Sequence, residues 1–161
     1  MPKHSSNSLN GLVSELTGFH QHAYRFETLE QTFAITKEER LEFARPEFSA
    51  SRNEMTWHTG RALPNARPLT ALGSEERETA ELQYNQCLRA IEERLLGMSN
   101  GTKRVEQFHK FVSIPDVSSI LVVPDAGGNS FVLLNWGTRN SKVRDTGGDG
   151  AAVHSLQVVL K

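Results

Sequence analysis

The longest periodic pattern in this sequence is an apolar stripe through the middle of the chain. Apolar residues recur at steps of three and four positions, which places them on one face of a helix. They are Ala80, Tyr84, Cys87, Leu88, Ile91 and Leu95. Ser74 is a favoured N-cap residue, and Glu75 and Glu76 suit the positive end of the helix dipole. The pattern ends at Gly97 and therefore predicts one long helix over about residues 74–96.

A second, shorter helical pattern follows at about residues 102–113. Thr102 can cap this helix, and Pro115 stops it. Its apolar face would contain Val105, Phe108, His109 and Val112. Because the connection between the two helices is short, we expect them to pack as an antiparallel hairpin.

Beyond Pro115 the pattern changes, and two runs carry apolar residues at consecutive positions. Ser119–Val123 and Ser130–Trp136 are separated by a loop of turn residues, which predicts a β-hairpin. Consecutive apolar residues are typical of strands in the middle of a sheet, where both faces are buried. A last strand is expected at Ala152–Leu160. Together these elements predict an α+β fold, in which a mainly antiparallel sheet of about four to six strands carries both helices on one face.

Weaker patterns occupy the first part of the chain. Residues 1–8 are polar, which predicts a disordered tail, and residues 9–161 are expected to form a single domain. Leu12, Val13 and Leu16 favour a short helix that ends near Gly18.

Two strands with weak patterns are expected next. Residues 22–29 alternate in a way that favours a strand, and Gln31–Thr36 favours a second one. Lys37–Arg40 marks a turn or the start of a helix. Residues 49–73 are rich in Ser, Asn, Gly and Pro and are expected to form a long irregular connection. Trp57 would pin this connection to the body of the protein.

The charge balance and the single cysteine limit the classes of protein that fit this chain. With 18 basic and 19 acidic residues among 161, the formal net charge is −1, so no nucleic-acid partner is expected. One cysteine, Cys87, cannot form an intramolecular disulfide. No signal peptide is recognisable, and no run approaches the ~20 apolar residues that span a bilayer. We therefore expect a cytoplasmic protein without membrane insertion by this segment.

A histidine pair is the first candidate site. On a strand, His20 and His22 would point to one face and could share a zinc ion. A third ligand could come from His58, His154 or Glu27. This hypothesis makes the chain a small metal-dependent enzyme with zinc as its cofactor. In the alternative interpretation, both histidines are polar residues on a solvated strand face, and no cofactor is needed.

The glycine-rich segment Gly137–Gly150 is the second candidate site. Its glycines allow backbone N–H groups to converge, and Arg139, Lys142 and Arg144 add positive charge. These features favour binding of an anion or a nucleotide, although the order of residues does not match a Walker A loop. Three aspartates, Asp125, Asp145 and Asp149, could instead offer oxygen ligands to a divalent cation. The segment could also be a solvated connection whose glycines permit turns.

For two further residues, the sequence allows either a functional role or a packing role. Trp136 lies at a strand end beside a loop, where tryptophan often anchors an interface, but it would equally serve at the edge of the core. Cys87 lies in the apolar stripe of the long helix, which favours core packing over nucleophilic chemistry.

No sequence motif supports a particular reaction, because the chain has no Gly-x-Ser-x-Gly or Ser-x-x-Lys motif. The favoured interpretation is a non-catalytic protein-interaction or regulatory module. It would form the N-terminal cytoplasmic domain of a larger protein of bacterial type. Its partner would be another protein or further domains of the same polypeptide.

Overall fold

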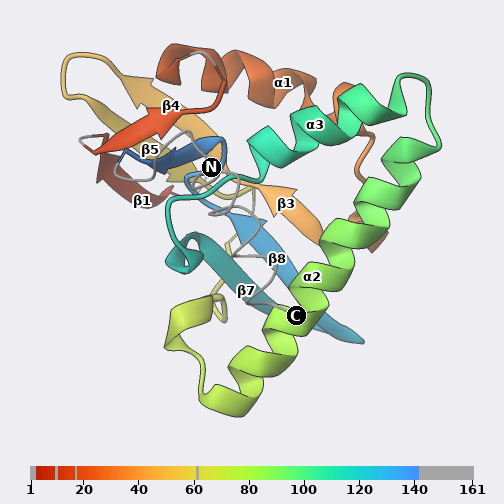
Figure 1. Cartoon of the computed structure of the whole chain (residues 1–161). Helices are drawn as coiled ribbons and strands as arrows, with labels where there is room; N and C mark the ends of the chain where they lie inside the picture. The colour runs from red at the N-terminus through yellow and green to blue at the C-terminus, as the bar shows by residue number, and fades with distance from the viewer. Residues whose placement is uncertain (1–2, 10, 17, 61, 142–161) are drawn as a thin grey trace.

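The computed structural model describes residues 3–9, 11–16, 18–60 and 62–141, which form an α+β fold with mainly antiparallel sheets (Figure 1). The largest sheet has four strands in the order β3-β8-β7-β6. A three-stranded sheet has the order β1-β5-β4, and β2 pairs with β9 in a two-stranded ribbon. This architecture confirms the predicted fold class. The expected strand at Ala152–Leu160 lies outside the described residues.

The predicted central hairpin is confirmed. Its strands are β7 (Ile120–Asp125) and β8 (Gly128–Leu133), which pair antiparallel with Ile120 opposite Leu133. Gly127 and Gly128 have φ angles of +83° and +138° at the turn, which is a conformation that favours glycine. The hairpin is extended by the short strands β3 (Leu41–Phe43), parallel to β8, and β6 (Arg67–Pro68), antiparallel to β7.

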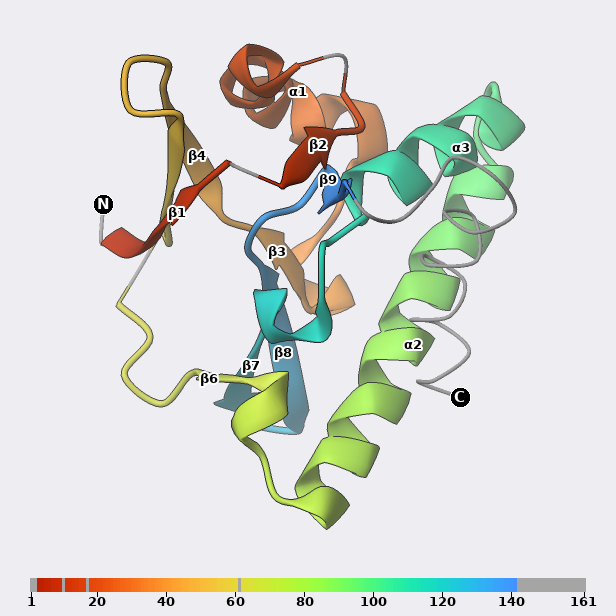
Figure 2. The same cartoon turned by 60° about the vertical axis from the view of Figure 1, so that its left-hand side comes forward.

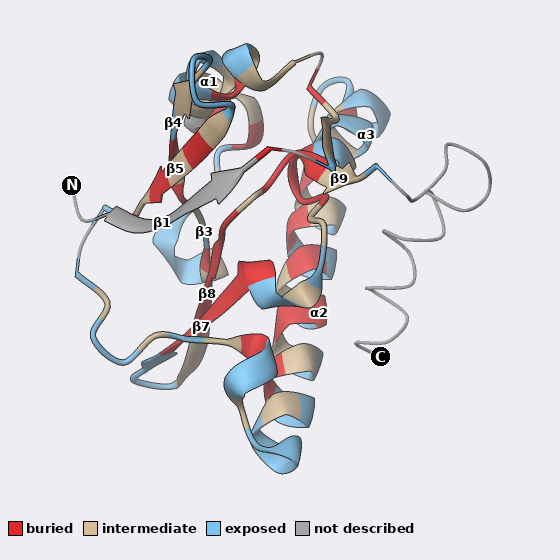
Figure 3. Ribbon diagram, turned by 90° about the vertical axis from the view of Figure 1, so that its left-hand side faces the viewer, coloured by how far each residue is buried: buried red, intermediate tan, exposed pale blue. Residues whose placement is uncertain are grey.

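The two predicted helices are α2 (Ser74–Leu96) and α3 (Gly101–Phe111), and α2 lies along one face of the hairpin sheet (Figure 1). The rings of Tyr84 and Phe131 meet edge to face at 5.3 Å between helix and sheet. Figure 3 shows the buried residues of α2 turned toward the buried strands β7 and β8. Within the described residues, no helix has the length and apolar character needed to cross a membrane.

Both predicted helix caps are wrong, the first by one residue and the second by two. Ser74 is the first helical residue, and Gly73 takes the N-cap position without a side-chain hydrogen bond. The second helix begins at Gly101, and Asn100 takes the N-cap position in place of Thr102. The tight connection explains this start, because a Cβ atom at position 101 would lie 2.4 Å from the carbonyl oxygen of Leu96. Glycine therefore permits the close approach of α3 to the end of α2.

The expected disordered tail at residues 1–8 is wrong for Lys3–Ser8, which form β1 at the edge of the three-stranded sheet (Figure 2). This strand pairs antiparallel with β5 (Glu54–His58). An edge strand is held by backbone hydrogen bonds, so it can form from polar residues that carry no apolar pattern.

The long connection at residues 49–73 contains β5, which the prediction missed. β4 (Arg45–Ser49) and β5 form a hairpin around Asn53, whose φ angle is +51°. In β5, Met55 and Trp57 are buried and their neighbours are partly exposed, so the alternation of a half-buried strand is present. Between β5 and β6 the described residues form no helix or strand.

The region expected to hold two weak strands is instead the helix α1 (His22–Phe33). His22, Phe26, Leu29 and Phe33 follow one another at steps of four, three and four residues, and they form the side of α1 that packs on the core. The alternation of residues 22–29 in the sequence therefore predicted the wrong secondary structure, because the buried residues follow helical spacing. Likewise, Leu12–Ser14 form the strand β2, paired with β9 (Thr138–Asn140), and not a short helix. Lys37–Glu39 form a single 3₁₀ turn, as the turn signal indicated.

Candidate functional site

A groove with a volume of about 530 Å³ lies between α1 and the edge strand β3. We call it the α1–β3 groove. Its apolar lining comes from both elements and from the linker between them: Phe26, Leu29, Ile35, Leu41 and Phe43. Its polar and charged lining consists of Glu27, Thr36, Lys37, Glu42 and Arg45, and Gly60 also lines it. The groove therefore combines an apolar floor with a charged rim, as ligand sites commonly do.

One wall of the groove is an open strand edge. The carbonyl of Arg40 accepts from Phe131 N–H at 2.8 Å, and the N–H of Ala44 donates to Leu133 at 3.0 Å. Because backbone groups alternate in direction along a strand, those of Leu41 and Phe43 point away from β8. Among the described residues, β3 has no strand on that side. Leu41 is only 4% exposed, whereas Phe43 is half-buried, so the edge opens to the groove at Phe43.

The charges at the rim are mostly paired. Arg45 Nη2 lies 2.6 Å from Glu27 Oε1, and its guanidinium sits 5.1 Å above the centre of the Phe26 ring. This arrangement fixes Arg45 against α1 and neutralises Glu27. Lys37 is exposed and has no ion pair with any described residue. Glu27 and Glu42 together balance the charges of Lys37 and Arg45, so the lining as a whole carries no net charge.

Trp136 forms the base on which the groove is built. Its ring stacks on Phe26 of α1 at 6.3 Å and meets Phe43 of β3 edge to face at 5.6 Å. Its Nε1–H donates to the carbonyl oxygen of Ala44 at 2.7 Å. The side chain is fully buried, so of the two alternatives for Trp136 the packing role fits the structure and the interface anchor does not. Its structural role is to hold α1 and the β3–β4 junction at a fixed separation.

The strand on which the zinc hypothesis depended is absent. His20 lies in the 3₁₀ turn Phe19–Gln21 and is exposed, whereas His22 begins α1 and is fully buried. His22 stacks between Phe19 and Trp136, and its Nε2 lies 2.8 Å from Ser14 Oγ. The two imidazoles therefore occupy different environments. Among the residues the structure describes, no three His, Cys, Asp or Glu side chains are grouped so that they could hold a metal ion.

Burial also changes the acid–base chemistry of His22. Removal from water disfavours the imidazolium form and lowers the pKa of His22 from 6.5 to about 4. Its Nδ1 is buried without a hydrogen-bond partner. His22 is therefore neutral near pH 7 and belongs to the aromatic core around Trp136.

The basic residues of the glycine-rich segment are only partly described. Arg139 lies on β9, where its Nε is 2.6 Å from Glu15 Oε1. Lys142 and Arg144 lie outside the described residues. The predicted anion site is therefore not assembled within the part of the chain that the structure describes. Asp125 accepts a hydrogen bond from the N–H of Ala126 at 2.8 Å and stabilises the β7–β8 turn.

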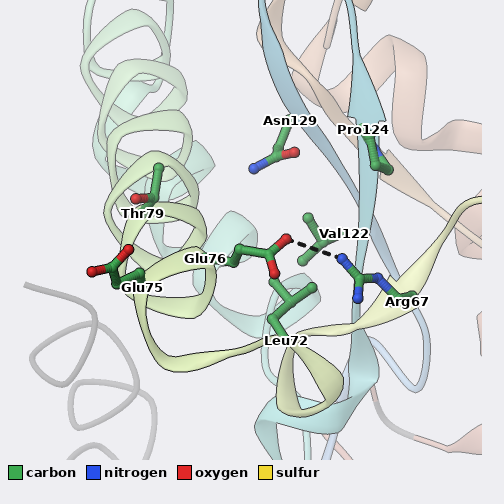
Figure 4. Close-up of a pocket in the computed structure, with 8 residues that line it drawn as sticks. All are labelled: Arg67, Leu72, Glu75, Glu76, Thr79, Val122, Pro124 and Asn129. Atoms are coloured by element: carbon green, nitrogen blue, oxygen red, sulfur yellow. Dashed lines mark hydrogen bonds and ion pairs between the residues drawn. The ribbon is translucent and has the colours of Figure 1, made fainter.

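A second, smaller pocket of about 310 Å³ lies between the first turns of α2 and the outer strands of the large sheet (Figure 4). Arg67 and Glu76 form an ion pair of 3.1 Å across this pocket. Val122 and Leu72 provide its apolar surface. Because these two charges face each other, Arg67 and Glu76 neutralise each other inside the pocket, and Glu75 also lines it.

Cys87 is not activated as a nucleophile. It is half-buried on α2, and burial raises the pKa of the Cys87 thiol, an effect that the nearby Arg40 guanidinium only partly opposes. A raised pKa lowers the fraction of reactive thiolate at neutral pH. These properties agree with the packing role that the apolar stripe indicated.

Comparison of the chain with protein-family models, with curated proteins and with solved structures gives no match.

Sequence reasoning missed the groove because it missed α1. Phe26 and Leu29 were assigned to a strand, so no helix was available to form a wall opposite β3. The signal that could have found this wall is the helical spacing of His22, Phe26, Leu29 and Phe33. Nothing in the local sequence could show that Phe43 lies at an open edge, because the order of strands depends on pairing with residues 131–133.

Proposed function

We propose that this chain is a non-catalytic protein-interaction module that binds an extended segment of a partner protein in the α1–β3 groove. The observation that carries the proposal is the open edge of β3 beside an apolar floor. An unpaired strand edge is a template for an additional strand, and folded domains commonly bind peptides in this way.

The groove provides both parts of such an interaction. The backbone groups of Phe43 can form hydrogen bonds with the backbone of a bound segment of any sequence, so they contribute affinity without specificity. Phe26, Leu29 and Ile35 form an apolar surface that can accept a side chain of the bound segment. Since apolar anchors dominate the binding free energy of most interfaces, this surface would select the partner.

The rigid base supports a preformed site. Trp136 is packed against rings from three other segments, with centroid distances of 5.3 Å to His22, 5.6 Å to Trp57 and 5.7 Å to Phe111. A wall fixed by such packing loses little conformational entropy when a ligand binds. The presence of one free cysteine is compatible with the reducing cytoplasm, which we propose as the location.

Filling the groove with a side chain tests the proposal. Gly60 lines the groove, and a Cβ atom at this position would meet nothing within 4 Å. Gly60→Trp therefore adds a bulky group at the rim without a clash in the fold. Peptides selected from a random displayed library against the full chain should bind Gly60→Trp at least about tenfold more weakly than the original protein.

The matched control is Gly73→Trp, because Gly73 is also exposed and its Cβ would come no closer than 3.7 Å to Glu76. This variant should retain the peptide affinity of the original protein. In nuclear magnetic resonance titrations, the amide of Phe43 should shift on peptide addition. Selected peptides that bind both variants equally and leave the Phe43 amide unchanged would show that the groove is not the binding site.

A further inference from the structure

We infer that residues 152–160 of this same chain occupy the α1–β3 groove as an added strand, and that a partner displaces them when it binds. This inference rests on the proposed function, because it names the segment that competes with a partner for the same groove. Residues 152–160 lie outside the described part of the chain. Their assignment to the groove follows from the sheet edge that is open, from the pattern of the segment and from the length of chain between the two.

β3 is the sheet edge best suited to receive another strand. At the opposite edge of the four-stranded sheet, β6 contains Pro68, which has no backbone N–H to donate. The three-stranded sheet has β4, with Pro46, at one edge and the polar strand β1 at the other. β3 contains no proline and borders the apolar floor of the groove. Among the edges of these two sheets, β3 therefore combines free backbone groups with an apolar surface.

The sequence of residues 152–160 suits this surface. Alternate side chains of the segment would share one face of a strand, namely His154, Leu156, Val158 and Leu160. Three of these four are apolar, so this face can cover the groove floor and remove both surfaces from water. The segment contains no Asp, Glu, Lys or Arg. Its lack of charge matches the groove lining, in which two carboxylates balance two basic groups.

The chain between the groove and the segment is long enough for this contact. The rings of Trp136 and Phe43 are 5.6 Å apart, and Ser141, the last described residue, follows Trp136 by five positions. Those five positions extend over at most about 18 Å. Residues 142–151 can extend over a further ~33 Å, which is enough for residue 152 to return to β3.

Attachment to the same chain strengthens a weak contact. A segment on a tether of this length is present at an effective concentration of about 1 mM. If the separate segment bound with a dissociation constant of about 0.1 mM, the tethered one would fill the groove in about ten molecules of eleven. A partner would then bind about tenfold more weakly than it binds an empty groove.

Two substitutions of equal charge on opposite faces of the segment test the inference in the full chain. Leu156→Glu would bury a carboxylate against the apolar floor and therefore release the segment. The matched control Gln157→Glu adds the same charge on the face turned away from the floor. In hydrogen exchange followed by nuclear magnetic resonance, the Phe43 amide should be protected in the original protein and in Gln157→Glu. It should exchange at least about tenfold faster in Leu156→Glu.

Peptide binding provides a second measurement. A library peptide that is weakened by Gly60→Trp should bind Leu156→Glu about tenfold more tightly than the original protein, and Gln157→Glu should match the original. A synthetic peptide of residues 151–161, added to Leu156→Glu, should slow exchange of the Phe43 amide again and displace the library peptide. Because this rescue requires a folded groove, it also shows that Leu156→Glu has not unfolded the protein.

The possible results distinguish this inference from the proposed function. Equal Phe43 exchange and equal peptide affinity in Leu156→Glu and the original protein would overturn the inference, while sensitivity of library peptides to Gly60→Trp would still support the proposed function. Library peptides that ignore Gly60→Trp would refute the proposed function, whereas Phe43 protection that depends on Leu156 would still support occupation of the groove by the chain itself. A dimer that dissociates in Leu156→Glu would place the segment of a second copy in the groove and overturn the assignment to the same chain.

Discussion

The C-terminal part of the described chain, from α2 to β8, and the N-terminal part, from β1 to β5, follow different rules of assembly. In the C-terminal part, β7 pairs with β8 directly after it in the chain, and α3 follows α2. In the N-terminal part, β3 pairs with β8, and β2 pairs with β9 almost at the other end of the described chain. Apart from the local hairpin of β4 and β5, these N-terminal strands are therefore defined by contacts that the local sequence does not contain. This difference indicates that a periodic pattern predicts a helix or strand well when the elements that pack against it are near in the chain.

Trp136 is the residue at which the two parts meet, so its removal tests the comparison most strongly. The ring contacts His22, Phe26, Phe43 and Trp57 from the N-terminal part and Phe111 from α3. Trp136→Ala should lower the free energy of unfolding by about 4 kcal/mol, because a large cavity would remain. Urea unfolding followed by circular dichroism measures this change. A loss below about 1 kcal/mol would mean that the N-terminal part does not depend on this contact.

The buried His22 should make the stability of the protein depend on pH. In the unfolded chain its pKa is near 6.5, and in the folded chain burial lowers its pKa to about 4. The unfolded state therefore binds a proton first as the pH falls. The stability present above pH 6.5 is lost progressively down to about pH 4, by about 3 kcal/mol in total.

The variant His22→Phe isolates this effect, because it keeps an aromatic ring beside Trp136 and removes the titrating group. Its unfolding free energy, measured at several pH values between 7 and 4, should fall less steeply than that of the original protein. Equal slopes for the two proteins would show that other groups cause the pH dependence, and that His22 does not link α1 to the core as a neutral ring.

The smallest of these effects is expected at β1, where the sequence and the structure disagree most. Removal of residues 1–8 would delete the backbone ladder with β5 and expose the edge of that strand. We expect a loss of about 2 kcal/mol in unfolding free energy, since each net hydrogen bond contributes about 1 kcal/mol. A chain that starts at Lys3 is the matched control and should keep full stability. If both truncated chains are equally stable, residues 3–8 add nothing to the fold, as the polar sequence first indicated.

The candidate site was less predictable than the fold around it. The groove needs α1, β3 and Gly60 to meet, and these lie in three segments that are separate in the sequence. The predicted site residues do not line the groove. Trp136 is buried beneath it, the His22 ring packs against the Trp136 ring, and Arg139 is paired with Glu15. Aromatic and basic residues mark both cores and binding surfaces, so residue type alone could not separate the two roles.

The sequence by itself determined the long helix and the central hairpin, because an amphipathic stripe at helical spacing and consecutive apolar residues each match one kind of burial. Tertiary structure decided between the alternating and the helical spacing at His22–Phe33. It alone decided that the polar residues 3–8 form a strand and that β3 lies at an open edge. Short segments with weak patterns can adopt more than one secondary structure at similar free energy. Their state is then selected by the hydrogen bonds and apolar surface that distant parts of the chain provide.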